Sequence, residues 1–175
     1  MKLVVQRVLS ASVTVDGAIV SSIGRGLLVL CGLSNSEEAD SADWCSRRLL
    51  GVKLWPNAEG KPWKSSVVDI DGEILLVSQF TLFHRLKGNN PDWSMAMPPD
   101  AARSAYANFV ATVQSQYAEA KVSTSFFFSA ARFSHLPQIT TLDLPPTHHR
   151  NISAAHASPG QKRCVRRDDE CRTRD

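Results

Sequence analysis

The first 33 residues contain four segments whose apolar pattern predicts β-strands. Segments 2–8, 11–15 and 18–23 alternate between apolar and polar positions, as strands with one covered face do. Asp16-Gly17 separates the second segment from the third, and this pair favours a tight hairpin turn. The continuous apolar segment 27–33 is typical of a central strand covered on both faces.

Two helices are expected, one on each side of the middle of the chain. Ser34 and Glu37 form a capping-box pattern, and the helix after it is expected to end near Leu50. Pro98-Pro99-Asp100 favours the start of a second helix of about 20 residues. Its apolar residues recur at steps of three and four, which predicts packing on a sheet: Ala102, Tyr106, Phe109, Val113 and Tyr117.

A buried strand is expected over residues 73–82, and its carboxyl end is unusually polar. The apolar run Glu73-Ile74-Leu75-Leu76-Val77 continues into a segment, named here the ledge, formed by Ser78, Gln79, Phe80 and Thr81. Hydroxyl and amide groups that become covered need hydrogen-bond partners. The ledge is therefore either a plain strand end or a set of polar groups and backbone N–H donors available to a ligand.

The remaining segments complete an α+β (mixed α/β) domain. Residues 52–55 and 138–144 are candidate short strands, and 84–99 form a long connection of the kind that is often functional. The order of elements predicts a mostly antiparallel sheet covered by two main helices, over residues 1–144. Residues 145–175 are rich in Pro, His, Ser and Arg and are expected to form a disordered basic tail.

Charge, cysteines and hydropathy narrow the class of protein. Residues 1–146 hold 13 basic and 13 acidic residues, so the net charge of +3 lies in the tail. A neutral body indicates that any RNA would be held by a small feature such as one end. Cys31, Cys45, Cys164 and Cys171 have no metal-binding spacing and are expected to be free thiols. No apolar run is long enough for a membrane span or a signal peptide, so a cytoplasmic protein is expected.

The ledge lacks a recognisable nucleophile and base. The sequence contains no nucleophile elbow, no Walker loop and no His-Glu-x-x-His. His84 is the nearest histidine, and a surface role is the commoner one for a lone loop histidine. Without a base, Ser78 or Thr81 is a weak nucleophile, and the alternative is catalysis by positioned backbone N–H groups. Phe80 could stack on a base or pack in the core.

Several segments together resemble the D-aminoacyl-tRNA deacylases of the DTD type. The opening residues 1–8, the segments 11–15 and 23–27, and Lys87-Gly88-Asn89-Asn90-Pro91-Asp92 are similar to that family. Ser78-Gln79-Phe80-Thr81-Leu82 matches its first signature motif. The resemblance covers residues 1–122.

The resemblance implies a cytoplasmic homodimer that hydrolyses the ester between a D-amino acid, or glycine, and the 3′-terminal adenosine of tRNA, with no metal or other cofactor. Ser78, Gln79, Phe80 and Thr81 would be the catalytic segment. The backbone N–H groups of Phe80 and Thr81 would face the substrate carbonyl. Either Thr81 acts as nucleophile or the 2′-hydroxyl of the tRNA assists a water. Arg7 would help to fix the family's second motif.

That second motif is where the sequence departs from the family. The family has Gly-Pro-Val-Thr, whose Gly–cis-Pro reaches into the partner's site and excludes L-amino acids. Leu136-Pro137-Gln138-Ile139-Thr140 is the nearest segment here, which makes Pro137 the candidate for this role. Residues 125–131 contain no glycine, unlike the preceding Phe-Gly-Ala segment of the family.

Two explanations of the divergent end compete. The end is translated from intron or shifted-frame sequence, or the gene has diverged and lost the chiral filter. Three hypotheses for function follow: an active deacylase, a catalytically inactive protein that binds tRNA or another nucleic acid, and a truncated product without function.

Overall fold

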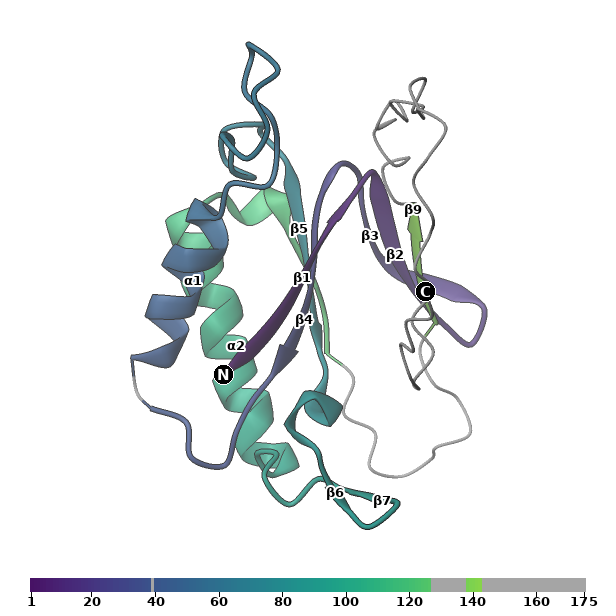
Figure 1. The fold of residues 1–175 in the computed structure, drawn as a ribbon. Helices are drawn as coiled ribbons and strands as arrows, with labels where there is room; N and C mark the ends of the chain where they lie inside the picture. Colours follow the sequence, from purple (N-terminus) through teal and green to yellow (C-terminus); the bar gives the residue numbers. More distant parts are fainter. Residues whose placement is uncertain (39, 127–137, 143–175) are drawn as a thin grey trace, which may run out of the picture. The chain divides into compact units, whose positions relative to one another are not determined.

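The computed structural model describes residues 1–38, 40–126 and 138–142. In this part of the chain a four-stranded mixed sheet lies between two helices on one face and a three-stranded sheet on the other (Figure 1). The first sheet contains β1 (Lys2–Val8), β4 (Gly26–Gly32), β5 (Glu73–Ser78) and β8 (Val122–Ser125), and the second contains β3 (Ala18–Ile23), β2 (Ser10–Val15) and β9 (Gln138–Leu142). The helices are α1 (Ser41–Gly51) and α2 (Pro99–Gln116).

The early strands form as the apolar pattern predicts. Asp16 and Gly17 have φ of 49° and 80°, which joins β2 to β3 in the expected tight turn. Alternate residues of β4 face opposite layers: Leu27 and Val29 pack in the helix-side core, and Leu28 packs against the second sheet. The prediction of a central strand covered on both faces is confirmed.

Parallel pairing in the first sheet is the feature that the strand pattern did not predict. β1 runs antiparallel to β4, whereas β4, β5 and β8 run parallel to one another. The other pairs are antiparallel, so the mixed α/β class and the mostly antiparallel pairing are confirmed. Because β4, β5 and β8 are parallel, their carboxyl ends meet at one edge of the sheet, where ligands bind in many α/β proteins.

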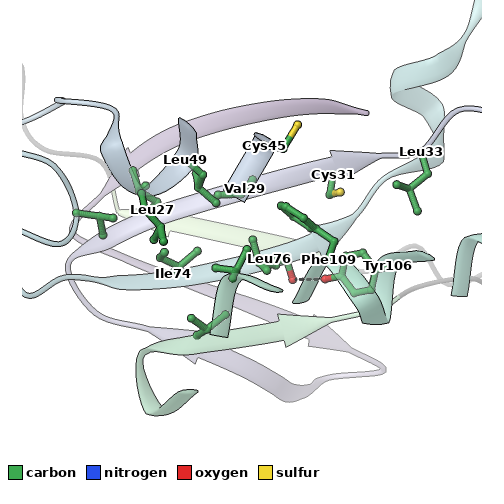
Figure 2. Close-up of a cluster of buried hydrophobic side chains, with 14 of the residues drawn as sticks. Leu27, Val29, Cys31, Leu33, Cys45, Leu49, Ile74, Leu76, Tyr106 and Phe109 are labelled. Carbon is green, nitrogen blue, oxygen red and sulfur yellow. Dashed lines mark hydrogen bonds between the residues drawn. The ribbon is translucent and has the colours of Figure 1, made fainter. Parts of the chain in front are cut away.

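The two helices cover one face of the sheet. The buried face of α2 is the one that the sequence predicts, whereas α1 is shorter than expected. Ala102, Tyr106, Phe109 and Val113 are buried on α2, and Figure 2 shows two of them, Tyr106 and Phe109, against the sheet. The expected start of α1 is wrong, since the helix begins at Ser41.

The capping-box residues of α1 form a turn of their own. Glu37 accepts from the backbone N–H of Ser34 at 3.2 Å, as in a capping box. The Ser34 hydroxyl, however, accepts from Ser36 N–H, and Glu37 also pairs with the Met1 ammonium group. These contacts stabilise a separate turn, so the chain enters α1 four residues after Glu37.

Three other expectations need adjustment. Residues 52–55 form no strand and only one bridge, between Trp55 and Ser65. The connection 84–99 contains a short hairpin of β6 (Arg85–Lys87) and β7 (Asn90–Asp92). The last expected strand is present as β9 and pairs with β2. The tail 145–175 and its boundary at residue 144 lie outside the described residues and stay predictions.

Tyr106 joins two strands of the sheet from within the core. Its hydroxyl donates to the carbonyl of Leu76 at 2.8 Å, and the carbonyl of Ser125 lies 3.3 Å away (Figure 2 shows the bond to Leu76). The residue is 3% exposed, and burial raises the pKa of its hydroxyl, so the group stays protonated. Tyr106 thus links β5 and β8 just before their carboxyl ends.

Tyr106→Phe is expected to lower the free energy of unfolding by about 1–2 kcal/mol, because the buried carbonyl of Leu76 loses its hydroxyl donor. Urea denaturation would measure it. Tyr117→Phe is the comparison, since its hydroxyl donates to Gly72 from a half-buried position at 2.8 Å and should matter less. Equal stability of Tyr106→Phe and the unchanged protein would contradict this role.

Candidate active site at the carboxyl ends of the parallel strands

The ledge lies where β5 leaves the sheet, and it is a turn rather than the end of a strand. β5 ends at Ser78, and Phe80–Phe83 forms a short 3-10 helix, η1, so the expected strand over 73–82 is wrong at its carboxyl end. Gln79 N–H donates to the Cys31 carbonyl at 2.7 Å, which extends the pairing with β4 by one residue. The chain then turns, and Leu82 N–H reaches the Gln79 carbonyl at 3.3 Å.

Gly32 makes room for this turn. A side chain there would place its Cβ 2.9 Å from the Cβ of Leu82 and 3.2 Å from the carbonyl oxygen of Gln79. Because neither atom is the flexible end of a side chain, η1 can lie against the end of β4 only where residue 32 has no side chain. The sequence of β-forming residues in Phe80–Phe83 gives no sign of this tertiary constraint.

Side chains of the ledge are partly covered, and two of them are bonded to each other. Ser78 is 8% exposed, and the other three ledge residues are half-buried. Gln79 Nε2 donates to Thr81 Oγ1 at 2.5 Å. The Thr81 hydroxyl thus accepts from an amide NH₂ group. This NH₂ group is a donor and cannot act as the base that removes the proton of Thr81.

His84 is bonded to the backbone of the ledge, and Cys31 is a buried, neutral thiol. The Nδ1 atom of His84 lies 2.9 Å from the backbone carbonyl of Thr81, so it donates to that carbonyl and does not contact the hydroxyl. Burial raises the pKa of the Cys31 thiol to about 12, so it carries no thiolate at neutral pH. Among the described residues, no hydrogen bond joins the hydroxyl of Ser78 or Thr81 to a group that could act as a base. No His, Cys, Asp and Glu cluster in those residues could hold a metal ion.

Trp93 is a ledge neighbour that the sequence pattern did not reveal. Its ring meets Phe80 edge to face, with 6.1 Å between ring centroids and 64° between planes. The hairpin β6–β7 places it there, because Asp92 pairs with Arg85 at 2.7 Å and with Lys87 at 3.0 Å. The Arg85 guanidinium, followed by Lys87, holds the pKa of Asp92 well below its usual range. Thirteen positions of sequence separate the two rings, and only the fold joins them.

Lys2 is the second unpredicted neighbour. Its ammonium group donates to the carbonyl of Leu82 at 3.1 Å and lies 4.5 Å from the centroid of the Phe83 ring. The register explains this position, since Lys2 pairs with Gly32 at the same edge of the sheet. The ledge therefore has one cation at its rim.

Arg7 lies at the other end of the sheet. It pairs with Leu27, which pairs with Ile74, four residues before Ser78, so about 13 Å of strand separates it from the ledge. Its guanidinium donates to the Leu54 carbonyl at 2.5 Å. The structure brings Ser78, Gln79, Phe80 and Thr81 together and leaves Arg7 apart from them within one chain. Pro137 lies outside the described residues.

The site and fold define a class: a mixed α/β protein with a polar ledge at parallel strand ends. A family model described as D-Tyr-tRNA(Tyr) deacylase matches residues 4–136, which extends past residue 122, where the resemblance was expected to stop. D-aminoacyl-tRNA deacylase 1 of Leishmania major is 46% identical over 128 residues, or 73% of this chain and 84% of that protein. D-aminoacyl-tRNA deacylase of Dictyostelium discoideum is 40% identical over 73% of this chain and 85% of that protein.

A solved structure shares the fold. The c-Myc DNA Unwinding Element Binding Protein superposes with a TM-score of 0.73 at 38% identity, over 81% of this chain and 91% of that chain. The chain belongs to the D-Tyr-tRNA(Tyr) deacylase family.

Proposed function

We propose that this chain hydrolyses the ester that joins a D-amino acid to the 3′-terminal adenosine of tRNA, as a proofreading step in translation. Glycyl-tRNA mischarged on tRNA-Ala is a second substrate. Water adds to the ester carbonyl carbon, the bond to the ribose oxygen breaks, and free amino acid and tRNA are released. The ledge at the parallel strand ends carries the proposal, because it is built from the residues of the family's first motif.

The ledge would act by positioning and by backbone N–H donors. In this account the N–H groups of Phe80 and Thr81 face the carbonyl oxygen, on which negative charge develops as water adds. Phe80 and Trp93 offer aromatic surface to the adenine base. Lys2 at the rim would attract the phosphate of the terminal nucleotide. Thr81 Oγ1 accepts from an amide, which supports a water assisted by the tRNA 2′-hydroxyl over a threonine nucleophile.

The second half of the site would come from a partner subunit. A homodimer would bring Pro137 of one chain to the ledge of the other, to exclude L-amino acids. Arg7 would then be a positioning residue for that segment, since it lies far from the ledge of its own chain. Sedimentation velocity would test the dimer. No helix in the described residues is long and apolar enough to cross a membrane. We place the protein in the cytoplasm, where tRNA is used.

The alternative of an inactive protein that binds nucleic acid is not favoured, since the curated relatives are named as deacylases. The test uses purified full-length protein with D-tyrosyl-tRNA and L-tyrosyl-tRNA, and measures released tyrosine. Hydrolysis of the D-ester alone is the expected result. No release from D-tyrosyl-tRNA or glycyl-tRNA, where an active relative releases both, would reject the proposal. If the protein hydrolyses L-tyrosyl-tRNA as well, only the proposed role of Pro137 in excluding L-amino acids is rejected.

A further inference from the structure

A basic and aromatic segment lies outside the proposed deacylation site. Residues 44–64 contain five basic residues and one acidic residue, whereas the other residues up to 146 contain eight basic and twelve acidic ones. The segment is therefore more basic than the rest of the body, although Asp43 and Asp69 lie just outside it. Such a concentration of cations is the usual mark of a nucleic-acid contact.

The cations and aromatic rings of this segment are available at the surface. Trp44 is 55% exposed and Trp63 is 63% exposed. Arg48 lies with its guanidinium carbon 5.3 Å from the centroid of the Trp44 ring. We name as the basic surface the exposed residues Trp44, Arg48, Lys53, Trp63 and Lys64.

Part of the positive charge is not held in close ion pairs, although the Asp69 carboxylate lies in the neighbourhood of Lys53. Arg47 pairs with Asp43 at 2.6 Å and Lys61 pairs with Glu59 at 2.8 Å. Within the part of the chain that the structure describes, no ion pair involves the three cations of the basic surface, Arg48, Lys53 and Lys64. A solvated charged face of no further role would more often intersperse both signs.

Trp63 is held in a conformation that bulky residues rarely adopt. Its φ is 57°, in the left-handed region, where a large side chain is a true outlier. The loop on which it stands is fixed by backbone bonds, among them Lys64 N–H to the Trp55 carbonyl at 2.9 Å. The side chain gains little burial in return, so packing within this chain does not account for it. A strained, exposed and fixed tryptophan indicates a binding role.

Lys64 and the loop that carries Trp63 lie toward the end of the sheet opposite to the ledge, whereas Trp44 shares a pocket with Met1 at the ledge end. Leu54, which accepts from Arg7, stands at the level of Ile74 near the start of β5, while the ledge follows Ser78. The four residues from Ile74 to Ser78 separate these two levels by about 13 Å. This span is larger than one nucleotide, so the ledge and the loop would contact different parts of one RNA.

We propose that the basic surface binds the tRNA beyond its terminal adenosine. Arg48, Lys53 and Lys64 contact backbone phosphates, and Trp63 stacks on an unpaired base or packs on a ribose. This inference rests on the proposed function only in naming tRNA as the RNA. It assigns to this surface the affinity for the tRNA body, whereas the ledge holds the reacting end.

The first test is a charge reversal at Lys64. Binding of uncharged tRNA by the full chain is measured by fluorescence anisotropy at several salt concentrations. Lys64→Glu is expected to weaken binding about fivefold and to reduce the slope of log affinity against log salt by about 1. The matched control is Arg25→Glu, which makes the same charge change at an exposed turn between β3 and β4 and should bind within about twofold of the unchanged protein. Equal effects of the two changes, or none, would overturn the proposal.

The second test removes the aromatic ring and keeps the backbone. Asparagine adopts the left-handed region readily, so Trp63→Asn is expected to keep the melting temperature of the unchanged protein. Its tRNA affinity is expected to fall about fivefold to tenfold. A variant that binds tRNA as before, or that simply loses stability, would show that Trp63 is structural.

Kinetics separate this proposal from the deacylase proposal. With D-tyrosyl-tRNA, Lys64→Glu should raise KM and leave kcat unchanged. With D-tyrosyl-adenosine, which reaches only the ledge, both constants should stay unchanged. If the unchanged protein cleaves neither substrate, the deacylase proposal fails, and the binding of uncharged tRNA still decides the role of the basic surface.

Discussion

Gly26→Ala is expected to lower the melting temperature by about 10 °C or more, the largest loss of stability of any single substitution considered for this chain. An added Cβ at this position would lie 1.8 Å from the carbonyl oxygen of Glu73 and 2.7 Å from its backbone N and C atoms. Gly26 opens β4, and Glu73 opens β5 directly beside it. The two parallel strands would have to separate where they begin, at a cost of more than about 3 kcal/mol.

Gly24→Ala provides the control for this result. Gly24 lies two residues earlier in the same turn, and an added Cβ would make only an ordinary contact, 3.7 Å from a carboxylate oxygen of Glu73. Its melting temperature should stay within a few degrees of the unchanged protein, as measured by circular dichroism. If both alanine variants melt alike, the close approach of β4 and β5 at Gly26 does not limit stability.

Gly32→Ala is expected to reduce kcat/KM for D-tyrosyl-tRNA about 100-fold while the protein stays folded. The added Cβ would meet the Cβ of Leu82 at 2.9 Å and the ring of Phe83 at 3.2 Å. These contacts lie on η1 and not in the strands, so the displaced element is the ledge. A shift of several tenths of an ångström would move the N–H groups of Phe80 and Thr81 away from the developing oxyanion.

Gly51→Ala is the matched control for the ledge. Nothing lies within 4 Å of a Cβ at Gly51, which ends α1, so activity and stability should both be retained. Deacylation rates and urea denaturation on the same preparations separate activity from folding. Full activity of Gly32→Ala would show that the position of η1 is not critical, and unfolding of that variant would show that Gly32 supports the core instead.

The sequence predicts correctly those turns, helices and strands that depend mainly on residues close together in the chain. The turn at Asp16-Gly17 forms because both residues tolerate positive φ, and the buried stripe of α2 follows from helical spacing. The strand of residues 27–33 is found because an uninterrupted apolar run suits only a doubly covered strand.

Features that depend on contacts between distant segments were not predicted. The strand pattern cannot give the parallel direction of β4, β5 and β8, since it is set by the connections and helices between them. The turn at Phe80 depends on the missing side chain of Gly32, which is 48 positions away. Trp93 and Lys2 reach the ledge through the hairpin and the register of β1.

The ledge residues were identified from the sequence, but their arrangement was not. Covered polar groups after an apolar strand are a visible signal, and the resemblance to the family motif is the basis of the chemical role proposed for them. The bond from Gln79 to Thr81 supports the proposed route through the tRNA 2′-hydroxyl, because it pairs the threonine hydroxyl with a donor. Basic and aromatic residues of 44–64 were visible as well, but a neutral total charge concealed their concentration.

Single-turnover hydrolysis of D-tyrosyl-tRNA by Thr81→Ala tests the central claim, that backbone N–H groups of the ledge and not a threonine hydroxyl promote the reaction. Thr81→Ser, which keeps a hydroxyl, is measured beside it. Thr81→Ala is expected to retain activity within about tenfold of the unchanged protein, because the backbone donors remain. A loss of about five to six orders of magnitude, as expected for removal of a nucleophile, together with substantial activity of Thr81→Ser, would contradict it.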